Sequence, residues 1–183
     1  MAKWRWREWA TDREQRQRLH LLAKVPLFAG LNRRQLGKLL VKLFEKEYHA
    51  GETIFREGDP GKALFIVLDG KVSITRTADG VDKPLAILTP GTYFGELALI
   101  DDQPRFAGAR ADEDSVLLIL YKSHFDDLID GHKALAIEVM GNLLKALAGY
   151  VRAEQPRAPS RAGKAGPGSI TDQNAVPAER SRR

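Results

Sequence analysis

The residues best suited to chemistry lie in one segment, residues 93–111, which reads YFGELALIDDQPRFAGARA. The segment has a single glutamate, Glu96, directly after Gly95, and a Pro-Arg step that ends at Arg105. A guanidinium is a permanently charged fork of donors that suits a phosphate, and a carboxylate accepts hydrogen bonds from hydroxyl groups. Because glycine lets a backbone approach a bound molecule closely, the segment predicts a cradle for a ligand that carries both hydroxyls and a phosphate.

Other familiar chemistry is missing from the sequence. The chain has no cysteine, which excludes disulfide frameworks, thiolate zinc sites and thiol catalysis. Asp101 and Asp102 follow Glu96, but no general acid–base partner accompanies these carboxylates. Neither a nucleophile elbow nor a Gly-rich dinucleotide or phosphate-loop fingerprint is present. The four histidines are scattered, without metal-ligand spacing: His20, His49, His124 and His132. We therefore expect no metal site and no enzymatic activity.

The positive charge of the chain is concentrated at its two ends. Residues 1–24 and residues 152–183 each contain seven Lys/Arg and three Asp/Glu, a net charge of +4. Residues 25–151 contain fifteen basic and eighteen acidic residues, a net charge of −3. The overall charge of +5 therefore does not describe the globular part, and a nucleic-acid interface there is disfavoured.

Composition divides the 183 residues into three segments. We expect a Trp/Arg-rich N-terminal helix over residues 1–21, one globular domain over residues 22–154, and a disordered basic tail over residues 155–183. The N-terminus lacks the apolar core of a secretory signal, and we expect no apolar run near the ~20 residues that cross a bilayer. These features predict a cytoplasmic protein.

The N-terminal segment has two interpretations. Trp6 and Trp9 would share one face of a helix among several arginines, which is typical of a helix on a membrane surface, here through residues 1–18. The alternative is a helix that packs on its own domain or on a partner. The acidic residues Glu8, Asp12 and Glu14 weaken attraction to anionic lipid and favour the alternative.

The centre of the chain has the periodicity of short strands that follow a helix. Asn32 and Gln35 form a capping-box pattern before an apolar face at helical spacing, which predicts a helix from residue 33 to residue 44. From residue 47 to residue 121, apolar segments are short and punctuated by Gly, Pro and Asp. About eight such segments predict a mainly β fold, a sandwich or an eight-stranded jelly roll (β-roll). The clearest strands are residues 54–55, 63–68, 72–77, 85–88 and 116–120.

Helical signals return after Tyr121. Ser123 would cap a short helix that ends at Gly131, and a longer helix is expected from residue 132 to residue 152. Apolar residues of the longer helix repeat at steps of three and four, and they are Ala136, Met140, Leu143, Leu147 and Tyr150, with Ile137, Leu144 and Val151 beside them. This wide stripe allows two interpretations: one helix that covers the barrel, or an additional helix contact that would form a homodimer.

Two motifs, in this order, resemble the cyclic nucleotide-binding domain family. They are GETIFREGDPGKALFIVLDGKVSI at residues 51–74 and FGELALIDDQPRFAGARA at residues 94–111. The resemblance covers residues 22–152 and includes an arginine, Arg105, nine positions after Glu96. The family includes the catabolite activator protein, the regulatory subunits of cyclic-AMP-dependent kinase and cyclic-nucleotide-gated channels. It implies a β-roll flanked by N-terminal helices and two C-terminal helices.

The resemblance also implies a role for each residue of residues 93–111 that could do chemistry. Gly95 would let the backbone approach the ligand, Glu96 would accept from the ribose 2′-hydroxyl, and Arg105 would pair with the cyclic phosphate. A single helical turn after Gly95 would point backbone N–H groups at the phosphate. The donors expected for the remaining oxygens are the backbone N–H groups of Leu97, Ala98, Phe106 and Ala107. The alternative is an ion pair between Arg105 and Glu96 in an empty roll.

Two departures from the family pattern bear on the ligand. Phe106 stands where the family commonly has Ala, Ser or Thr, and its ring would crowd the phosphate or the base. A hydroxyl at that position helps to hold guanine, so its absence favours cyclic AMP over cyclic GMP. Gly108 replaces the usual Thr or Val under the base. The final helix of the family supplies a lid, which by register falls on Tyr150 and Val151, and Tyr150 would stack on adenine.

We therefore expect a stand-alone regulatory module that senses cyclic AMP and signals through its final helix to a protein partner. We expect no DNA-binding, catalytic or channel segment. The alternative function, which Phe106 motivates, is a degenerate roll that no longer binds nucleotide and serves as an interaction or scaffold module.

Overall fold

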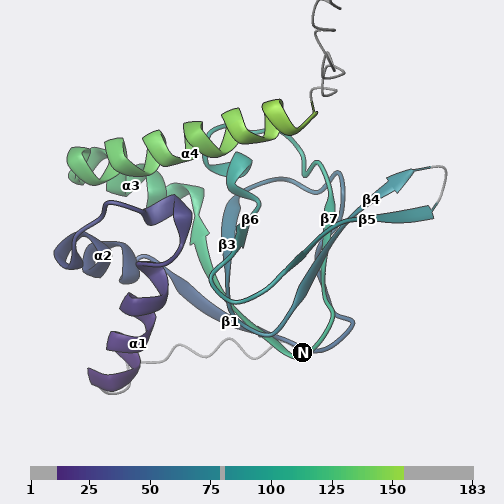
Figure 1. The fold of residues 1–183 in the computed structure, drawn as a ribbon, viewed down its shortest axis with the longest axis horizontal. Coiled ribbons are helices and arrows are strands. Elements are labelled where there is room, and N and C mark those ends of the chain that lie inside the picture. The colour runs from purple at the N-terminus through teal and green to yellow at the C-terminus, as the bar shows by residue number, and fades with distance from the viewer. Residues whose placement is uncertain (1–11, 79–80, 155–183) are drawn as a thin grey trace, which may run out of the picture.

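The computed structural model describes residues 12–78 and 81–154, and within them eight strands form two antiparallel four-stranded sheets (Figure 1). The first sheet has the order β1 (Phe44–Tyr48), β8 (Ser115–Tyr121), β3 (Ala63–Asp69) and β6 (Tyr93–Phe94). The second sheet has the order β2 (Thr53–Phe55), β7 (Gly108–Ala111), β4 (Val72–Ala78) and β5 (Val81–Leu88). The expected mainly β fold, an eight-stranded roll with flanking helices, is confirmed.

The central strands β3 and β8 are apolar on both faces because they serve two cores. Successive side chains of a strand point to opposite faces of the sheet. In β3, Leu64 and Ile66 belong to the core under the helices, whereas Phe65 and Val67 belong to the core inside the roll. The same alternation divides the side chains of β8. The continuous apolar runs in the sequence therefore mark strands that are covered on both sides.

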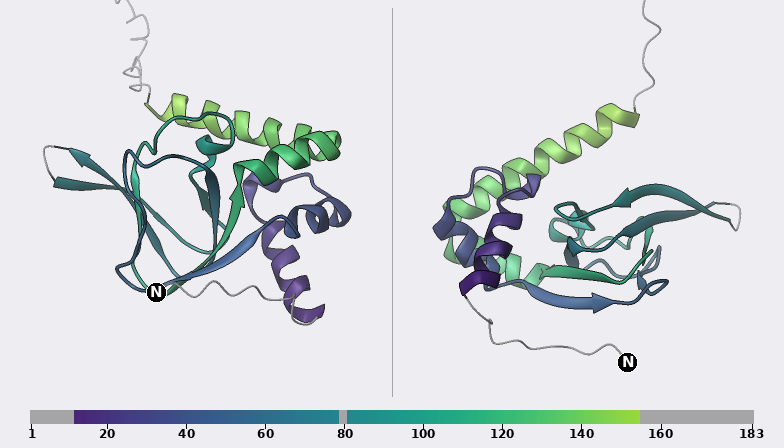
Figure 2. Two further views of the ribbon diagram at one scale, coloured as in Figure 1. Left: turned by 180° about the vertical axis from the view of Figure 1, so that it is seen from behind. Right: turned by 60° about the horizontal axis from the view of Figure 1, so that its bottom comes forward.

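The helices gather on the outer face of the first sheet, as the right-hand view of Figure 2 shows. They are α1 (Asp12–Leu22), the short 3-10 helix η1 (Pro26–Phe28), α2 (Arg33–Leu40), α3 (Lys122–Gly131) and α4 (Lys133–Glu154). Asn142 of α4 donates hydrogen bonds to the carbonyl oxygens of Leu27 at 3.2 Å and Ala29 at 2.8 Å. The N-terminal and C-terminal helices thus form one layer over the roll.

The helix predicted over residues 33–44 is shorter in the structure. Its capping box is confirmed, because the Asn32 side chain accepts from the Gln35 N–H and the Gln35 side chain accepts from the Asn32 N–H. The helix ends at Leu40, however, and Phe44 begins strand β1, opposite Ile119 of β8. Pairing with β8, which local periodicity does not show, overrides the helical pattern at this point.

Two other expectations need correction or extension. Tyr121, not Ser123, is the N-cap of α3, because the chain passes directly from β8 into the helix. Strand β5 starts at Val81, four residues before the predicted strand, and its pairing with β4 has an irregularity at residues 84–86. The predicted strands at residues 54–55, 63–68, 72–77 and 116–120 lie within β2, β3, β4 and β8.

The structure tests only part of the predicted N-terminal helix. Residues 1–11, which hold the tryptophans, lie outside the described residues, as do residues 79–80 and the predicted tail at 155–183. The described part, α1, packs on its own domain: Leu22 is buried in the core under the helices. Arg18 forms an ion pair with Glu45 of β1. This contact agrees with the interpretation in which the helix packs on its own domain.

Helix α4 corrects the expectation that no segment is apolar enough to cross a bilayer. Residues Lys133–Arg152 have the length of a membrane span and a mean hydropathy of 1.3. One face of this stretch is buried against the protein through Leu135, Ala136, Val139 and Leu143. Part of its apolar character is therefore explained by packing on its own core.

The turn at Gly70 provides a test of the roll. Gly70 has φ +88°, and a Cβ there would lie 2.6 Å from the carbonyl oxygen of Asp114 and from Cα of Ser115. Gly51 has a similar φ of +81°, but nothing lies within 4 Å of its added Cβ. We expect Gly51→Ala to cost about 1–2 kcal/mol of unfolding free energy from backbone strain alone. Gly70→Ala should cost a further ~1–3 kcal/mol from the steric clash.

Chemical denaturation of the two variants measures this difference. Equal losses of unfolding free energy in Gly70→Ala and Gly51→Ala would contradict the close approach of Gly70 to Ser115.

Candidate ligand-binding site

The site begins where strand β6 ends. Gly95 has φ +72°, in the left-handed region, and it leads into the short 3-10 helix η2 (Glu96–Leu99). A Cβ at Gly95 would lie 2.6 Å from Nη1 of Arg105. Backbone conformation and the approach of Arg105 therefore both require glycine at this position.

Arg105 is buried, and two backbone carbonyl groups hold its guanidinium. The residue is 9% exposed; Nη1 donates to the Gly95 oxygen at 3.1 Å and Nη2 to the Ala63 oxygen at 2.8 Å. The guanidinium carbon lies 4.2 Å from the centre of the Phe55 ring and 5.5 Å from that of Phe65, within cation–π range. Its Nε–H is also buried and has no acceptor among the described residues.

A turn between β2 and β3 holds the backbone of Arg105 in place. The Gly58 N–H donates to the Arg105 oxygen at 2.8 Å, and the Arg105 N–H donates to the Asp59 oxygen at 2.7 Å. Pro60 and Pro104 form a further bridge between the two segments. The two sequence motifs are thus joined by hydrogen bonds, and this contact is what sequence reasoning missed.

The second charged group of the site is Glu96, which is 7% exposed. No ion pair within 4.0 Å joins it to Arg105 in the described part of the chain; the guanidinium instead donates to the two carbonyl groups. Burial lowers the pKa of Arg105, and the negative charges of Asp59 and Glu96 oppose that shift. The site therefore contains a carboxylate and a guanidinium that are separated rather than joined in an ion pair.

Tyr150, near the C-terminal end of α4, reaches Glu96. Burial of the phenol is the main cause of its raised pKa, followed by the charge of Glu96, the neighbouring Tyr93 and a side-chain hydrogen bond with Glu96. Burial and the charge of Glu96 also raise the pKa of Tyr93. The structure thus brings the predicted lid residue to the predicted ribose acceptor.

Three of the four predicted backbone donors have no acceptor among the described residues. In the described residues, no hydrogen bond is donated by the backbone N–H groups of Leu97, Phe106 or Ala107. The Ala98 N–H donates to the Gly95 oxygen at a long 3.3 Å. With the free Nε–H of Arg105, these groups give the site a set of donors that suits an anion.

Phe106 does not fill the roll. Its side chain is 55% exposed, and the guanidinium carbon of Arg76 on β4 lies 4.9 Å from the centre of its ring. Gly108 begins β7, where a Cβ would come no closer than 3.5 Å to Thr75 Oγ1. Among the described interactions, neither Phe106 nor Gly108 contacts Arg105.

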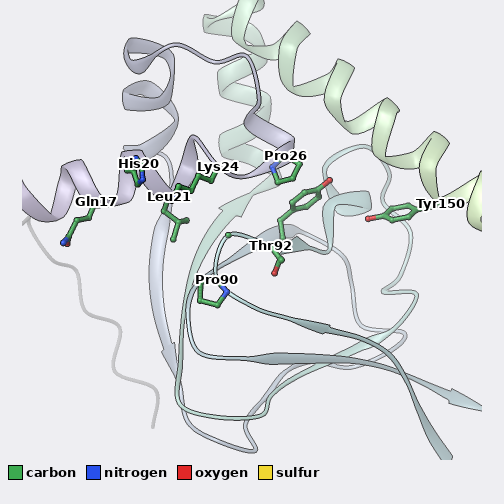
Figure 3. A pocket seen from close by; sticks show the side chains of 10 residues that line it. Gln17, His20, Leu21, Lys24, Pro26, Pro90, Thr92 and Tyr150 are labelled. Carbon is green, nitrogen blue, oxygen red and sulfur yellow. The ribbon is translucent and has the colours of Figure 1, made fainter.

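A groove of about 670 Å³ lies next to Tyr93 and Tyr150, between α1, the β5–β6 turn and α4. Gln17, His20, Leu21 and Lys24 line one side, and Pro90, Gly91, Thr92, Tyr93 and Tyr150 line the other. Figure 3 shows Tyr150 reaching into it from α4, across from His20 and Gln17. Glu96 and Arg105 do not line this groove, so it is a neighbour of the charged site rather than the site itself.

Residues 45–132 match the family model described as the cyclic nucleotide-binding domain. The chain belongs to this family. Its domain is 41% identical over 105 residues to a cyclic AMP receptor protein of Thermus thermophilus, which covers 57% of the chain and 49% of the receptor. It is 33% identical over 159 residues to cGMP-dependent protein kinase 2 of Mus musculus, which covers 78% of the chain and 20% of the kinase.

A solved structure matches most of the chain. The N-terminal domain of a transcriptional regulator from Streptomyces coelicolor matches this cyclic nucleotide-binding domain with a TM-score of 0.67 and 31% identity. The match covers 76% of the chain and 99% of that structure. The chain spans about half the length of the Thermus receptor and a fifth of the mouse kinase.

The tyrosines of the domain provide a test of the site by pH. All four, Tyr48, Tyr93, Tyr121 and Tyr150, have pKa values raised, mainly by burial, above the usual value of about 10. The folded state therefore favours the neutral phenols. The stability that they contribute is complete below pH ~10 and is lost as the pH rises through their raised pKa values.

Tyrosinate absorbance during an alkaline titration measures these pKa values. We expect little tyrosinate at pH ~10 in the native protein and half-ionisation there in denaturant. Tyr150→Phe should remove one of the late-titrating groups. Native tyrosines that ionise like free tyrosine would contradict the packing around Glu96.

Proposed function

We propose that this chain is a regulatory module that binds cyclic AMP in its β-roll and catalyses no reaction. The observation that carries the proposal is a buried Arg105 with a free Nε–H, next to a buried Glu96 that is not paired with it. An anion would neutralise the guanidinium and accept a hydrogen bond from Nε–H, which is otherwise costly to bury without an acceptor. Relatives whose names refer to cyclic AMP and cyclic GMP support the ligand class.

The cyclic phosphate would lie at Arg105. Its oxygens would accept from Nε–H and from the free backbone N–H groups of Leu97, Phe106 and Ala107, with Ala98 as a further donor after it releases Gly95. Charge-assisted hydrogen bonds of this kind contribute about 1.5–3 kcal/mol each. A Cβ at position 95 would clash with the guanidinium, so this position requires glycine. Without a side chain, the backbone of Gly95 can also come close to the phosphate.

The ribose 2′-hydroxyl would donate to Glu96. Tyr150 lies close enough to that carboxylate for its phenol to feel the charge, so a bound ribose would come next to the tyrosine. Binding would move Tyr150 onto the adenine ring and shift the end of α4. This shift would transmit the binding event to the surface of the protein. We infer that this movement is read by a protein partner in the cytoplasm.

The second candidate function is a roll that serves as a scaffold without nucleotide. Phe106 was the reason to consider it, because a ring inside the roll would block the ligand. The exposed position of that ring, beside Arg76, favours ligand binding instead.

Calorimetry with cyclic AMP and with cyclic GMP tests the proposal. We expect cyclic AMP to bind more tightly, and Arg105→Ala to weaken it by about 10- to 100-fold or more through loss of the charge-assisted bonds. Arg110→Ala is the matched control, since Arg110 is exposed on β7 five positions away. Absence of binding at sub-millimolar nucleotide, or equal affinity in Arg105→Ala, would support the scaffold instead.

Because Arg105 also holds Gly95 and Ala63, the Arg105→Ala variant needs a check of its fold. Circular dichroism and melting without nucleotide give this check. Added nucleotide should raise the melting temperature of the native chain but not of Arg105→Ala.

Two variants of Phe106 test the choice of base. Phe106→Ala should keep cyclic AMP affinity within a few-fold, because the ring is more than half exposed and lies beside Arg76. Phe106→Thr adds a hydroxyl near the proposed base position and should raise the affinity for cyclic GMP relative to cyclic AMP. Competition binding measures the ratio, and an unchanged ratio in Phe106→Thr would place the base elsewhere.

A further inference from the structure

The groove between α1 and α4 has two walls of different chemistry (Figure 3). The wall on the α1 side is polar: Gln17 and His20 lie on the helix, and Lys24 follows just after its end. Rings make up much of the opposite wall, and they belong to Pro90, Tyr93 and Tyr150. In the part of the chain that the structure describes, no Asp or Glu lines the groove. The groove therefore offers positive charge and apolar surface to one bound molecule.

The polar side chains of the α1 wall are available to a ligand. Gln17 and His20 are three positions apart, so they lie on one face of α1. Within residues 12–78 and 81–154, neither of them nor Lys24 forms a side-chain hydrogen bond or an ion pair. The backbone of Lys24 is fixed, because its N–H donates to the Leu21 oxygen at 2.9 Å. The wall thus presents an ammonium, an imidazole and an amide to the groove.

The opposite wall is held in place by hydrogen bonds. In the turn before β6, the N–H and the hydroxyl of Thr92 both donate to the Thr89 oxygen, at 3.0 Å and 2.6 Å. The Gly91 N–H donates to the Val67 oxygen of β3 at 2.9 Å. Tyr93 packs against the core under the helices. Because this wall is already formed, a ligand would bind it with little cost in ordering.

We propose that this groove binds a small aromatic carboxylate. The ring of the ligand would pack on Tyr93 and Tyr150, and its carboxylate would accept from Lys24. His20 or Gln17 would supply a further donor. A volume of about 670 Å³ is in the range of pockets that bind such molecules. Among the described lining residues Lys24 is the one permanent cation, which suits a monoanion better than a doubly charged phosphate.

Tyr150 connects the groove to the charged site. It lines the groove and lies near Glu96, which does not line it. This step rests on the proposed function, in which a nucleotide moves Tyr150 onto the adenine ring. A carboxylate packed on the phenol ring would instead hold Tyr150 where it now lies. The groove ligand would therefore oppose cyclic AMP, and cyclic AMP would weaken the groove ligand by the same factor.

Calorimetry with naphthalene-2-carboxylate and its neutral counterpart, naphthalene-2-carboxamide, tests the groove. The two probes share one ring system, so a difference in affinity reports the charge. We expect the carboxylate to bind more tightly, and Lys24→Gln to weaken it about 3-fold or more while the carboxamide stays nearly unchanged. Lys133→Gln is the matched control, since Lys133 is exposed at the start of α4 and does not line the groove. Equal affinity of the native chain and Lys24→Gln for the carboxylate would overturn the site.

Arg105 is a second cation that could bind the carboxylate, and Arg105→Ala separates the two positions. The affinity for naphthalene-2-carboxylate should be the same in this variant as in the native chain, because Arg105 does not line the groove. Loss of the probe in Arg105→Ala would place it inside the roll and overturn the proposal.

Titration with cyclic AMP at saturating naphthalene-2-carboxylate tests the coupling. We expect the probe to lower the affinity for cyclic AMP about 5-fold or more in the native chain. It should have no effect in Tyr150→Ala, where the shared ring is missing. Unchanged affinity in the native chain would overturn the coupling. A chain that binds the carboxylate through Lys24 but binds no cyclic nucleotide would contradict the proposed function and support the groove alone.

Discussion

A guanidinium inside a protein needs hydrogen-bond acceptors and groups that compensate its positive charge. The arrangement of the roll provides these groups at Arg105. Carbonyl groups from two different strand ends, Ala63 and Gly95, accept two of its donors, while Phe55 and Phe65 offer ring faces to its flat surface. The Nε–H, another of its five donors, has no acceptor among the described residues. Sequence features that are far apart, the left-handed Gly95 and the turn around Asp59, follow from holding this one side chain.

The same strands connect the charged site to the helical layer. Strand β3 supplies the Ala63 carbonyl to Arg105, and its next residues, Leu64 and Ile66, pack under the helices. Helix α4 returns over that layer and brings Tyr150 near Glu96. A change at the charged site therefore has a short path through packed side chains to the outer helix.

Sequence reasoning succeeded where the signal is local or nearly so. The Asn32–Gln35 capping box, the apolar runs of β3 and β8, and the glycine before Glu96 are each visible within a few residues. It failed at Phe44, whose strand partner Ile119 lies far along the chain. It also missed the backbone carbonyl acceptors of Arg105, because every residue has a carbonyl group and sequence does not mark which one is used. The groove between α1 and the β5–β6 turn also escaped notice, because its two sides come from segments far apart in the sequence.

Tyr150 and Val151 are neighbours in the chain but belong to different surfaces. One reaches Glu96, and the other is exposed on the outer side of α4. A rigid helix cannot shift the first without the second. A ligand that displaces Tyr150 would therefore also displace Val151, and the exposed side of the helix would report what happens at the buried carboxylate.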